Sequence, residues 1–252
     1  MRRLAALVAV LLLAGCGGGS SGAVAASTRM PTPSRTVTVF AAASLTESFN
    51  DLARAFEQRH PGTTVRLSYA GSQSLVAQIQ QGARPDLVVT ADVTSMSALT
   101  SDLDGAPVVL ARNALAVVTE KGNPKHLSAL ADLGGPGLKV VLGAADVPVG
   151  RAASAALSAA AVKVEPVSRE NDVKSVLAKV RLGEADAGIV YVTDLKSAGV
   201  DVGGFPFGGA VNSYPAGLVK GAPDAPGGRE LLVFANGPDG QAVLARYGFL
   251  PS

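Results

Sequence analysis

Hydrophobic and polar positions follow two different periods along the chain after residue 35. Residues 36–39 and 64–69 alternate with a period of two, which predicts two strands. Between them, apolar residues recur at helical spacing over 45–56, and His60-Pro61-Gly62 ends that predicted helix. The continuous apolar run at 86–90 is typical of a buried parallel strand. Strands that alternate with helices in this way predict an α/β fold.

The second half of the chain repeats the strand–helix pattern after an extended segment. Residues 108–110 and 114–118 predict two strands with the polar Asn113 between them, and 214–219 predicts a strand that returns toward the first half. Two α/β units joined by extended crossings near Asn113 and Pro215 predict two lobes with a cleft between them. The expected boundaries are 35–113 plus 215–252 for lobe I and 114–214 for lobe II.

Small residues followed by a serine stand at two of the predicted helix starts. Ala41-Ala42-Ala43 precede Ser44, and Ala70-Gly71 precede Ser72. Ser44 with Glu47 three residues later matches a capping box, so plain N-capping is one interpretation of both serines. The other is an anion site, because a strand that enters a helix through small residues leaves free backbone N–H groups within reach of a ligand. The repetition of this context favours the anion site.

The first residues of the chain predict a targeting segment. Two arginines precede an apolar run over 4–14 that is too short to span a bilayer as a stable helix. Leu13-Ala14-Gly15-Cys16 resembles a lipobox, which predicts a lipoprotein signal peptide over 1–15 and lipidation of Cys16; an ordinary secretory signal with an incidental cysteine is the alternative. Residues 16–34 are expected to be a flexible tether. The domain would then be lipid-anchored to the cell membrane at its extracytoplasmic face, in a periplasm or at an open cell surface.

Composition and charge exclude several classes of function. Without the predicted signal peptide the 22 Lys and Arg become 20, which equals the 20 Asp and Glu, so the mature chain is formally neutral. No cluster of basic residues appears along the sequence, so we expect no nucleic-acid partner. Cys16 is the only cysteine, which excludes a disulfide or a thiolate metal site in the domain.

The sequence carries no motif of an enzyme. His60 and His126 are the only histidines, and neither lies in a motif for a base or a metal ligand. Within residues 35–252, no Gly-x-Ser-x-Gly surrounds a serine, and no phosphate-binding glycine loop follows a strand. Asp86 and Asp92 lie at the two ends of a predicted strand, where capping is the commoner role for an aspartate. We therefore expect a protein that is not an enzyme and that has no cofactor.

Seven segments, in order along the chain, resemble the substrate-binding proteins of molybdate ABC transporters, which are type II periplasmic binding proteins. The first, Val39-Phe-Ala-Ala-Ala-Ser-Leu-Thr46, would be suggestive alone, and the ordered set is specific. The resemblance covers nearly the whole domain from Val37. The other six segments are Tyr69-Ala-Gly-Ser-Gln-Ser-Leu75 with Gln78-Ile79, Pro85-Asp-Leu-Val-Val-Thr-Ala-Asp92, Val147-Pro-Val-Gly150, Glu170-Asn-Asp-Val173, Gly188-Ile-Val-Tyr191 and Arg246-Tyr-Gly-Phe249.

This resemblance implies a two-lobed α/β periplasmic-binding-protein fold that holds molybdate or tungstate in the cleft, without positive side chains, and delivers it to an ABC permease. The first lobe would bind the oxyanion through the hydroxyl and amide groups of Ser44 and Ser72. The second lobe would supply the backbone N–H groups of Val149 and Val173 and the hydroxyl of Tyr191. Val149 stands where the family more often has alanine, a change that need not matter for a main-chain donor. The protein is expected to be a monomer.

Several alternatives remain open at the level of the sequence. The same fold could be tuned to sulfate, phosphate or an organic ligand. A secreted serine hydrolase would use Ser44 or Ser72 as its nucleophile, and it needs a base that neither histidine supplies by its context. A structural surface lipoprotein would bind no anion. For Tyr191, the alternative to hydroxyl donation is a plain core aromatic.

Overall fold

The structure is a computed structural model that describes residues 34–252, apart from the side chains of 209 and 210. The signal peptide predicted over 1–15, the lipidation site Cys16 and the predicted tether as far as residue 33 lie outside the described residues. In the part of the chain that is described, no helix has the length and apolarity needed to cross a membrane.

Eight strands within residues 34–252 form one mixed sheet in the order β2-β1-β3-β8-β4-β7-β5-β6. Both ends of the sheet are parallel: β1 pairs with β2 and β3, and β5 pairs with β6 and β7. The antiparallel pair β4 and β8 joins the two ends. The strands are β1 Arg35–Ala42, β2 Thr63–Ala70, β3 Leu87–Val89, β4 Val108–Thr119, β5 Val140–Gly143, β6 Ser168–Glu170, β7 Ala187–Tyr191 and β8 Gly203–Leu218.

Helices pack around both ends of this sheet. The α-helices are α1 Thr46–Arg59, α2 Ser72–Gln80, α3 Val93–Ser97, α4 Pro148–Ala159, α5 Val173–Arg181, α6 Val192–Ala198, α7 Ala225–Asn236 and α8 Pro238–Tyr247. The 3-10 turns are η1 Ala43–Leu45, η2 Thr100–Asp102, η3 Leu130–Gly134 and η4 Gly199–Asp201.

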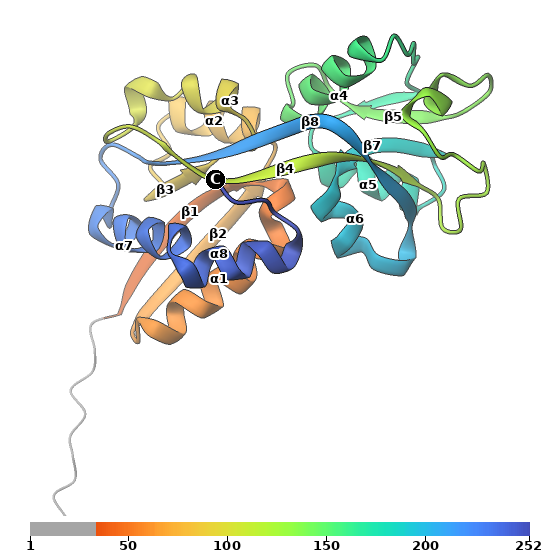
Figure 1. The fold of residues 1–252 in the computed structure, drawn as a ribbon. Coiled ribbons are helices and arrows are strands. Elements are labelled where there is room, and N and C mark those ends of the chain that lie inside the picture. The colour runs from red at the N-terminus through yellow and green to blue at the C-terminus, as the bar shows by residue number, and fades with distance from the viewer. Residues whose placement is uncertain (1–33) are drawn as a thin grey trace, which may run out of the picture. The chain divides into compact units, whose positions relative to one another are not determined.

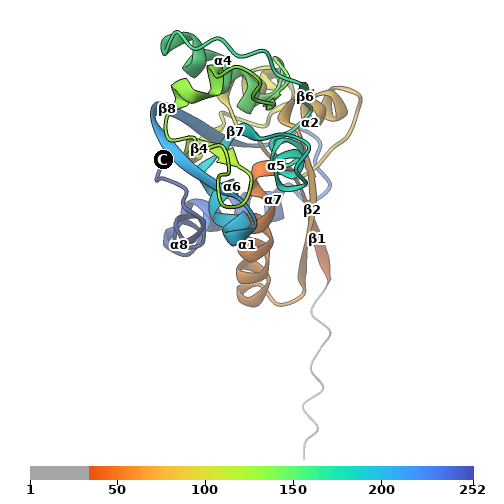
Figure 2. The same ribbon diagram turned by 90° about the vertical axis from the view of Figure 1, so that its right-hand side faces the viewer.

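Figure 1 shows two lobes that share the long strands β4 and β8. The first lobe contains β1, β2 and β3 with α1, α2, α3, α7 and α8, and the second contains β5, β6 and β7 with α4, α5 and α6. In Figure 2, turned by a right angle, α1 and α8 run along the same lobe, where they contact each other. All residues of β3, β5 and β7 are buried, as expected for strands covered on both faces. The predicted two-lobed α/β fold is confirmed.

Helix α1 shows why the local patterns predicted most elements correctly. The apolar residues at helical spacing, among them Phe49, Leu52 and Phe56, are buried against the sheet, as predicted. The helix ends at His60, whose ring stacks on Phe56 with 4.0 Å between the ring centroids. His60 therefore has a structural role at the C-terminal end of α1. It does not lie at the helix starts that carry Ser44 and Ser72.

Strand β4 differs from the prediction. The strands predicted over 108–110 and 114–118 form a single strand of 12 residues, and the polar Asn113 lies inside it. Strand β8 has 16 residues where only 214–219 was predicted, and it places Asn212 opposite Asn113. The long antiparallel ladder between these strands overrides the local break, because strand formation depends on cross-strand partners that a local pattern does not report.

Candidate functional site

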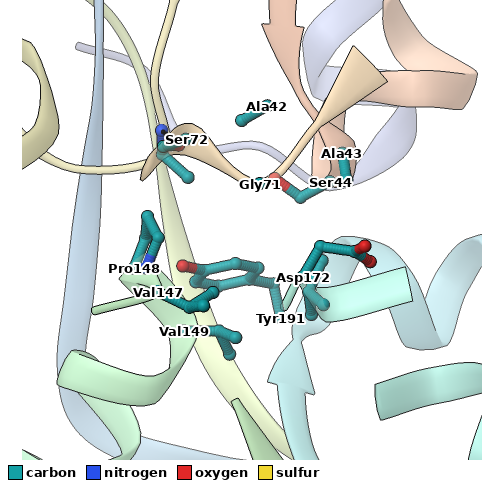
Figure 3. Close-up of a pocket in the computed structure, with 12 residues that line it drawn as sticks. Ala42, Ala43, Ser44, Gly71, Ser72, Val147, Pro148, Val149, Asp172 and Tyr191 are labelled. Atoms are coloured by element: carbon teal, nitrogen blue, oxygen red, sulfur yellow. Dashed lines mark hydrogen bonds between the residues drawn. The ribbon is translucent and has the colours of Figure 1, made fainter. Parts of the chain in front are cut away.

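Several helix starts from both lobes meet at one cavity (Figure 3). The first lobe contributes the turn η1, which contains Ser44, and helix α2, which begins at Ser72. The second lobe contributes α4, which begins at Pro148, and α5, which begins at Val173. The first N–H groups of a helix have no partner within the helix and carry partial positive charge. These starts therefore surround the cavity with hydrogen-bond donors.

The cavity is small. The volume open to the centre of a water molecule is about 20 Å³, somewhat more than the roughly 10–15 Å³ that one water needs on this measure. This space suits a ligand of a few atoms and excludes a sugar or a peptide. The lining brings together all five residues named from the sequence, and each is buried: Ser44, Ser72, Val149, Val173 and Tyr191.

Ser44 does not cap the helix that follows it, so the capping box predicted with Glu47 is wrong. The N-cap residue of α1 is Leu45, and no side chain caps this helix. The Ser44 hydroxyl instead forms a hydrogen bond with the hydroxyl of Tyr214 on β8, with 2.9 Å between the oxygens. Glu47 accepts a hydrogen bond from Lys174 of the second lobe. Partners from distant elements thus replace the local cap.

Ser72 is the first residue of α2 and follows the N-cap residue Gly71, so it is not an N-cap either. Its Oγ accepts a hydrogen bond of 3.0 Å from the backbone N–H of Ala91. Because a backbone N–H can only donate, the hydroxyl proton of Ser72 remains available for another acceptor. Ser72 can therefore present both its own N–H and its hydroxyl to the cavity.

Val149 and Val173 lie in the first turns of α4 and α5, where backbone N–H groups lack a partner within the helix. Asp172 caps α5 by accepting a hydrogen bond of 2.8 Å from the N–H of Ser175, so this cap does not occupy the N–H of Val173. Gly143 makes room for the side chain of Val149, because a Cβ at Gly143 would crowd the valine Cγ1. The larger side chain at this position is thus accommodated by a glycine on β5.

Tyr191 ends β7 and has 1% of its surface exposed. Its hydroxyl accepts a hydrogen bond of 2.9 Å from Nδ2 of Asn212 on β8. The ring packs edge to face on Tyr214, with 5.9 Å between the centroids. Burial above all, and nearby negative charge in addition, raise the pKa of the Tyr191 phenol well above its ordinary value. The hydroxyl therefore keeps its proton at neutral pH.

The charge of the lining follows from the same residues. Within the described part of the chain, no lysine or arginine lines the cavity, and Asp172 supplies its only carboxylate. The Asp172 oxygens accept hydrogen bonds from the N–H and the hydroxyl of Ser175, at 2.8 and 3.1 Å, so the carboxylate is bound to its own helix start. The cavity thus offers buried, neutral N–H and O–H donors. Such a donor set suits an anion, because hydrogen bonds to a charged acceptor are short and strong.

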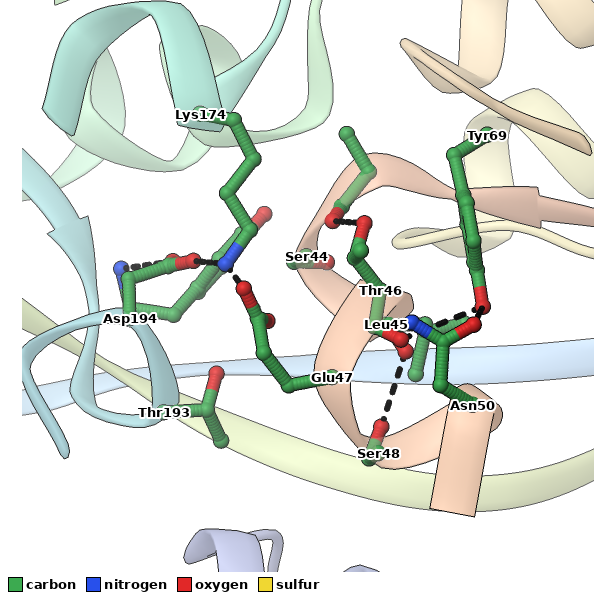
Figure 4. A network of polar contacts seen from close by, with 12 residues as sticks. Ser44, Leu45, Thr46, Glu47, Ser48, Asn50, Tyr69, Lys174, Thr193 and Asp194 are labelled. Atoms are coloured by element: carbon green, nitrogen blue, oxygen red, sulfur yellow. Dashed lines mark hydrogen bonds and ion pairs between the residues drawn. The ribbon is translucent and has the colours of Figure 1, made fainter. Parts of the chain in front are cut away.

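An ion-pair network joins the lobes beside the cavity (Figure 4). Lys174 on α5 donates to Glu47 on α1 at 2.7 Å and lies 3.0 Å from the carboxylate of Asp194. Asp194 is fully buried, and burial raises the pKa of its carboxyl. Burial lowers the pKa of Lys174, but the carboxylates of Asp194 and Glu47 more than offset this effect, so its pKa is raised. The ammonium therefore stays charged between carboxylates of different lobes.

Further contacts between the lobes involve the start of α2 and the loop after β3. The Nε2 of Gln73 donates a hydrogen bond of 2.7 Å to the backbone oxygen of Asn171 in the second lobe. Arg151 on α4 donates through Nε to Asp92 at 2.8 Å. Asp92 also caps α3 by accepting from the N–H of Ser95, which confirms its predicted capping role. The lobes are thus in direct contact through hydrogen bonds and an ion pair.

Asn212, Tyr214 and Lys174 contact the site without having been singled out from the sequence. Asn212 lies in a stretch of small and polar residues without a motif, and Tyr214 appeared only as the start of a predicted strand. Their roles depend on the pairing of β4 with β8 and on the approach of the lobes. No local signal reports either feature.

Comparison with known proteins gives the family. The profile described as "Bacterial extracellular solute-binding protein" matches residues 37–250. The chain belongs to this family. It is 36% identical, over 249 residues, to the molybdate-binding protein ModA of Mycobacterium tuberculosis, covering 96% of this chain and 95% of the relative. The sequence resemblance to molybdate-binding proteins of ABC transporters is thereby confirmed.

Solved structures of lower identity share the fold. A periplasmic molybdate-binding protein from Azotobacter vinelandii is 20% identical, with a TM-score of 0.71, covering 86% of this chain and 99% of that protein. The sulfate-binding protein SubI from Mycobacterium tuberculosis is 18% identical, with a TM-score of 0.74, covering 86% of each chain. Because these proteins bear the names of different oxyanions, the fold alone does not identify the ligand.

Proposed function

We propose that this chain is an extracytoplasmic solute-binding protein that captures molybdate, and also tungstate, and delivers the oxyanion to an ABC permease. One observation carries the proposal: buried neutral donors from both lobes converge on a cavity of about 20 Å³ whose described lining has no cationic side chain. The name of the Mycobacterium tuberculosis relative supports the choice of oxyanion.

The proposed ligand shell consists of the five residues named from the sequence. The hydroxyls of Ser44, Ser72 and Tyr191 and the amides of both serines donate to the oxyanion. The N–H groups of Val149 and Val173 complete the shell from the second lobe. Molybdate is a dianion that accepts hydrogen bonds and has no proton to donate, so every contact requires a protein donor. Each helix start adds about 0.3–1 kcal/mol of favourable electrostatic free energy, and more where it is partly buried.

Selection among oxyanions follows from the neutral shell. Molybdate and sulfate are both dianions, so a positive side chain would attract them equally. A rigid set of donors instead distinguishes tetrahedral anions by size, because a smaller anion leaves some donors at a distance and unpaired. We therefore propose that the distances between the donors of the two lobes select among oxyanions.

The binding cycle that we propose uses β4 and β8 as the hinge. The oxyanion first meets one lobe, and the other lobe closes on it through a small rotation of the crossing strands. For this motion the lobes are residues 35–113 plus 215–252 and residues 114–214. The pairing of Asn113 with Asn212, midway along the two strands, supports a hinge at this level.

We also propose that the mature protein is a monomer tethered by a diacylated Cys16, with residues 1–15 removed as a signal peptide and 16–34 as the tether. Two acyl chains hold a protein at a membrane where a single chain is marginal. The proposal includes no catalytic activity. Ser44 bonds to Tyr214 and Ser72 to Ala91, and within residues 34–252 neither His60 nor His126 lines the cavity, which supports this part of the proposal.

The experiment is a calorimetric titration of the ligand-free chain with molybdate, tungstate, sulfate and phosphate. We expect molybdate and tungstate to bind on the order of a hundredfold or more tighter than sulfate, a difference of about 2.7 kcal/mol. The Ser72→Ala variant should weaken molybdate binding, whereas Ser128→Ala, at an exposed serine outside the lining, should not. Equal affinity for sulfate would contradict the substrate assignment. No heat with any of the four anions would favour a structural lipoprotein.

A further inference from the structure

The side-chain amide of Asn212 has a single orientation that its surroundings permit. Its Nδ2 donates a hydrogen bond of 3.0 Å to the backbone oxygen of Ala91. A carbonyl oxygen can only accept, so the NH₂ group, and not the amide oxygen, must face Ala91. The same Nδ2 lies 2.9 Å from the hydroxyl oxygen of Tyr191, to which it donates its second hydrogen.

This contact determines which way the Tyr191 hydroxyl can donate. A tyrosine hydroxyl has one proton, and the Asn212 NH₂ group cannot accept it. The proton must therefore point away from Asn212. Tyr191 lines the cavity, so its hydroxyl can donate to a ligand held there, with the neighbouring Tyr214 hydroxyl as the competing acceptor. Without Asn212, the hydroxyl could rotate toward the space that the amide vacates and present its lone pairs to the anion.

We propose that Asn212 is a positioning residue that holds the Tyr191 hydroxyl as a donor toward the bound oxyanion. The inference rests on the proposed function, because it requires an anion in the cavity. Asn212 does not line this cavity, and it acts on the ligand through Tyr191.

The position of Asn212 in the fold links this role to the closed arrangement of the lobes. It lies on β8, one of the two strands that both lobes share, opposite Asn113 on β4. Its two acceptors belong to different lobes: Ala91 follows β3 in the first, and Tyr191 ends β7 in the second. The N–H of Ala91 in turn donates to Ser72. The contact with Ala91, which fixes the orientation of the Asn212 amide, therefore forms only when the second lobe stands against the first.

The test is a double-mutant cycle on molybdate affinity, with Asn212→Ala and Tyr191→Phe made singly and together. We expect Tyr191→Phe to weaken binding on the order of tenfold to a hundredfold, as for a hydrogen bond to a charged group. Asn212→Ala should weaken binding on the order of three- to tenfold in the wild-type chain. In the Tyr191→Phe background, Asn212→Ala should change affinity by less than about twofold, because no hydroxyl remains to be oriented.

Controls separate this role from a contribution to folding. Asn50 is a matched asparagine that accepts a hydrogen bond of 3.0 Å from the hydroxyl of Tyr69, outside the cavity lining. Asn50→Ala should leave molybdate affinity unchanged. Asn212→Leu, which fills more of the vacated space, provides a second variant if Asn212→Ala lowers the melting temperature.

Each outcome supports or overturns the inference. Coupling of the two substitutions supports it. The same loss of affinity from Asn212→Ala with and without the Tyr191 hydroxyl would overturn it while leaving the proposed function intact. Unchanged affinity in Tyr191→Phe would also overturn it, and again the protein would remain a molybdate-binding protein. Failure of the wild-type chain to bind molybdate would overturn both.

Discussion

At the residue scale, two hydroxyls of the site have their oxygen atoms occupied by protein donors. The backbone N–H of Ala91 donates to Ser72, and the amide of Asn212 donates to Tyr191. Each contact therefore leaves the hydroxyl proton available to another acceptor, such as a ligand in the cavity. This arrangement uses groups whose hydrogen-bonding direction is unambiguous, a backbone N–H and an amide NH₂. Serine and tyrosine hydroxyls can both donate and accept, and these contacts favour their use as donors toward the cavity.

The protonation of these donors leads to a prediction about pH. Burial raises the pKa of Tyr191 well above its ordinary value, and the phenol binds an anion only in its protonated form. Affinity is therefore retained below this raised pKa and is lost only as the pH rises through it. We expect the molybdate affinity to stay within about twofold from neutral pH to about pH 9, below the ordinary tyrosine pKa of about 10. Calorimetry in matched buffers measures this, and a clear change within that range would contradict the assignment of these donors.

At the scale of elements, the site is formed where helices begin, and one of these helices, α5, also carries a charge that joins the lobes. Val173 starts α5, and the next residue, Lys174, reaches both Glu47 on α1 and Asp194 on α6. The two ion pairs differ in burial. The side chain of Asp194 is 0% exposed and that of Glu47 is 41% exposed. The pair with Asp194 is thus the one on which stability depends, since exposed pairs contribute little.

Substitutions of the two partners should separate these contributions. Lys174→Met leaves the Asp194 carboxylate buried without its counter-charge, so we expect the free energy of unfolding to fall by about 3–5 kcal/mol at neutral pH. Glu47→Gln, the matched control, should change it by less than about 1 kcal/mol. Because burial raises the pKa of Asp194, acidic buffer should protonate this carboxyl and reduce the loss in Lys174→Met. Urea unfolding at two pH values measures both effects, and equal losses in the two variants would contradict this ranking.

At the scale of the whole molecule, the two lobes approach each other closely at Gly71. A Cβ at this position would collide with the backbone oxygen of Asn171 in the second lobe. The backbone of Gly71 has φ −58° and ψ 141°, a conformation that alanine adopts without strain. The absence of a side chain is therefore required by the contact between lobes and not by the local backbone. The hydrogen bond from Gln73 to Asn171 lies at the same contact.

This close approach predicts the behaviour of a single variant. Gly71→Ala should weaken molybdate binding by about 1–3 kcal/mol, because the added methyl group opposes the close approach of the lobes. It should also reduce the compaction that small-angle scattering detects when molybdate is added to the wild-type chain. Gly208→Ala, at a glycine with open space around it, is the matched control and should leave both quantities unchanged. Wild-type chain that shows no compaction with molybdate would argue against closure of the lobes.

The sequence by itself determined the elements that local forces control. The period of apolar residues predicted α1 and the buried strands, since amphipathic helices and covered parallel strands have patterns that neighbouring residues encode. The resemblance then named Ser44, Ser72, Val149, Val173 and Tyr191, and the structure brings all five to one cavity.

Only the tertiary structure decided how those residues are used. Ser44 has the pattern of a helix cap, yet its hydroxyl bonds to Tyr214, which lies 170 residues away in the chain. The polar Asn113 appeared to interrupt a strand, and it lies inside β4 because β8 pairs alongside it. The orientation of Asn212 depends on Ala91 and Tyr191, which come from different lobes. In each case the deciding partner is distant in sequence, and a hydrogen bond across such a distance leaves no mark on the local pattern.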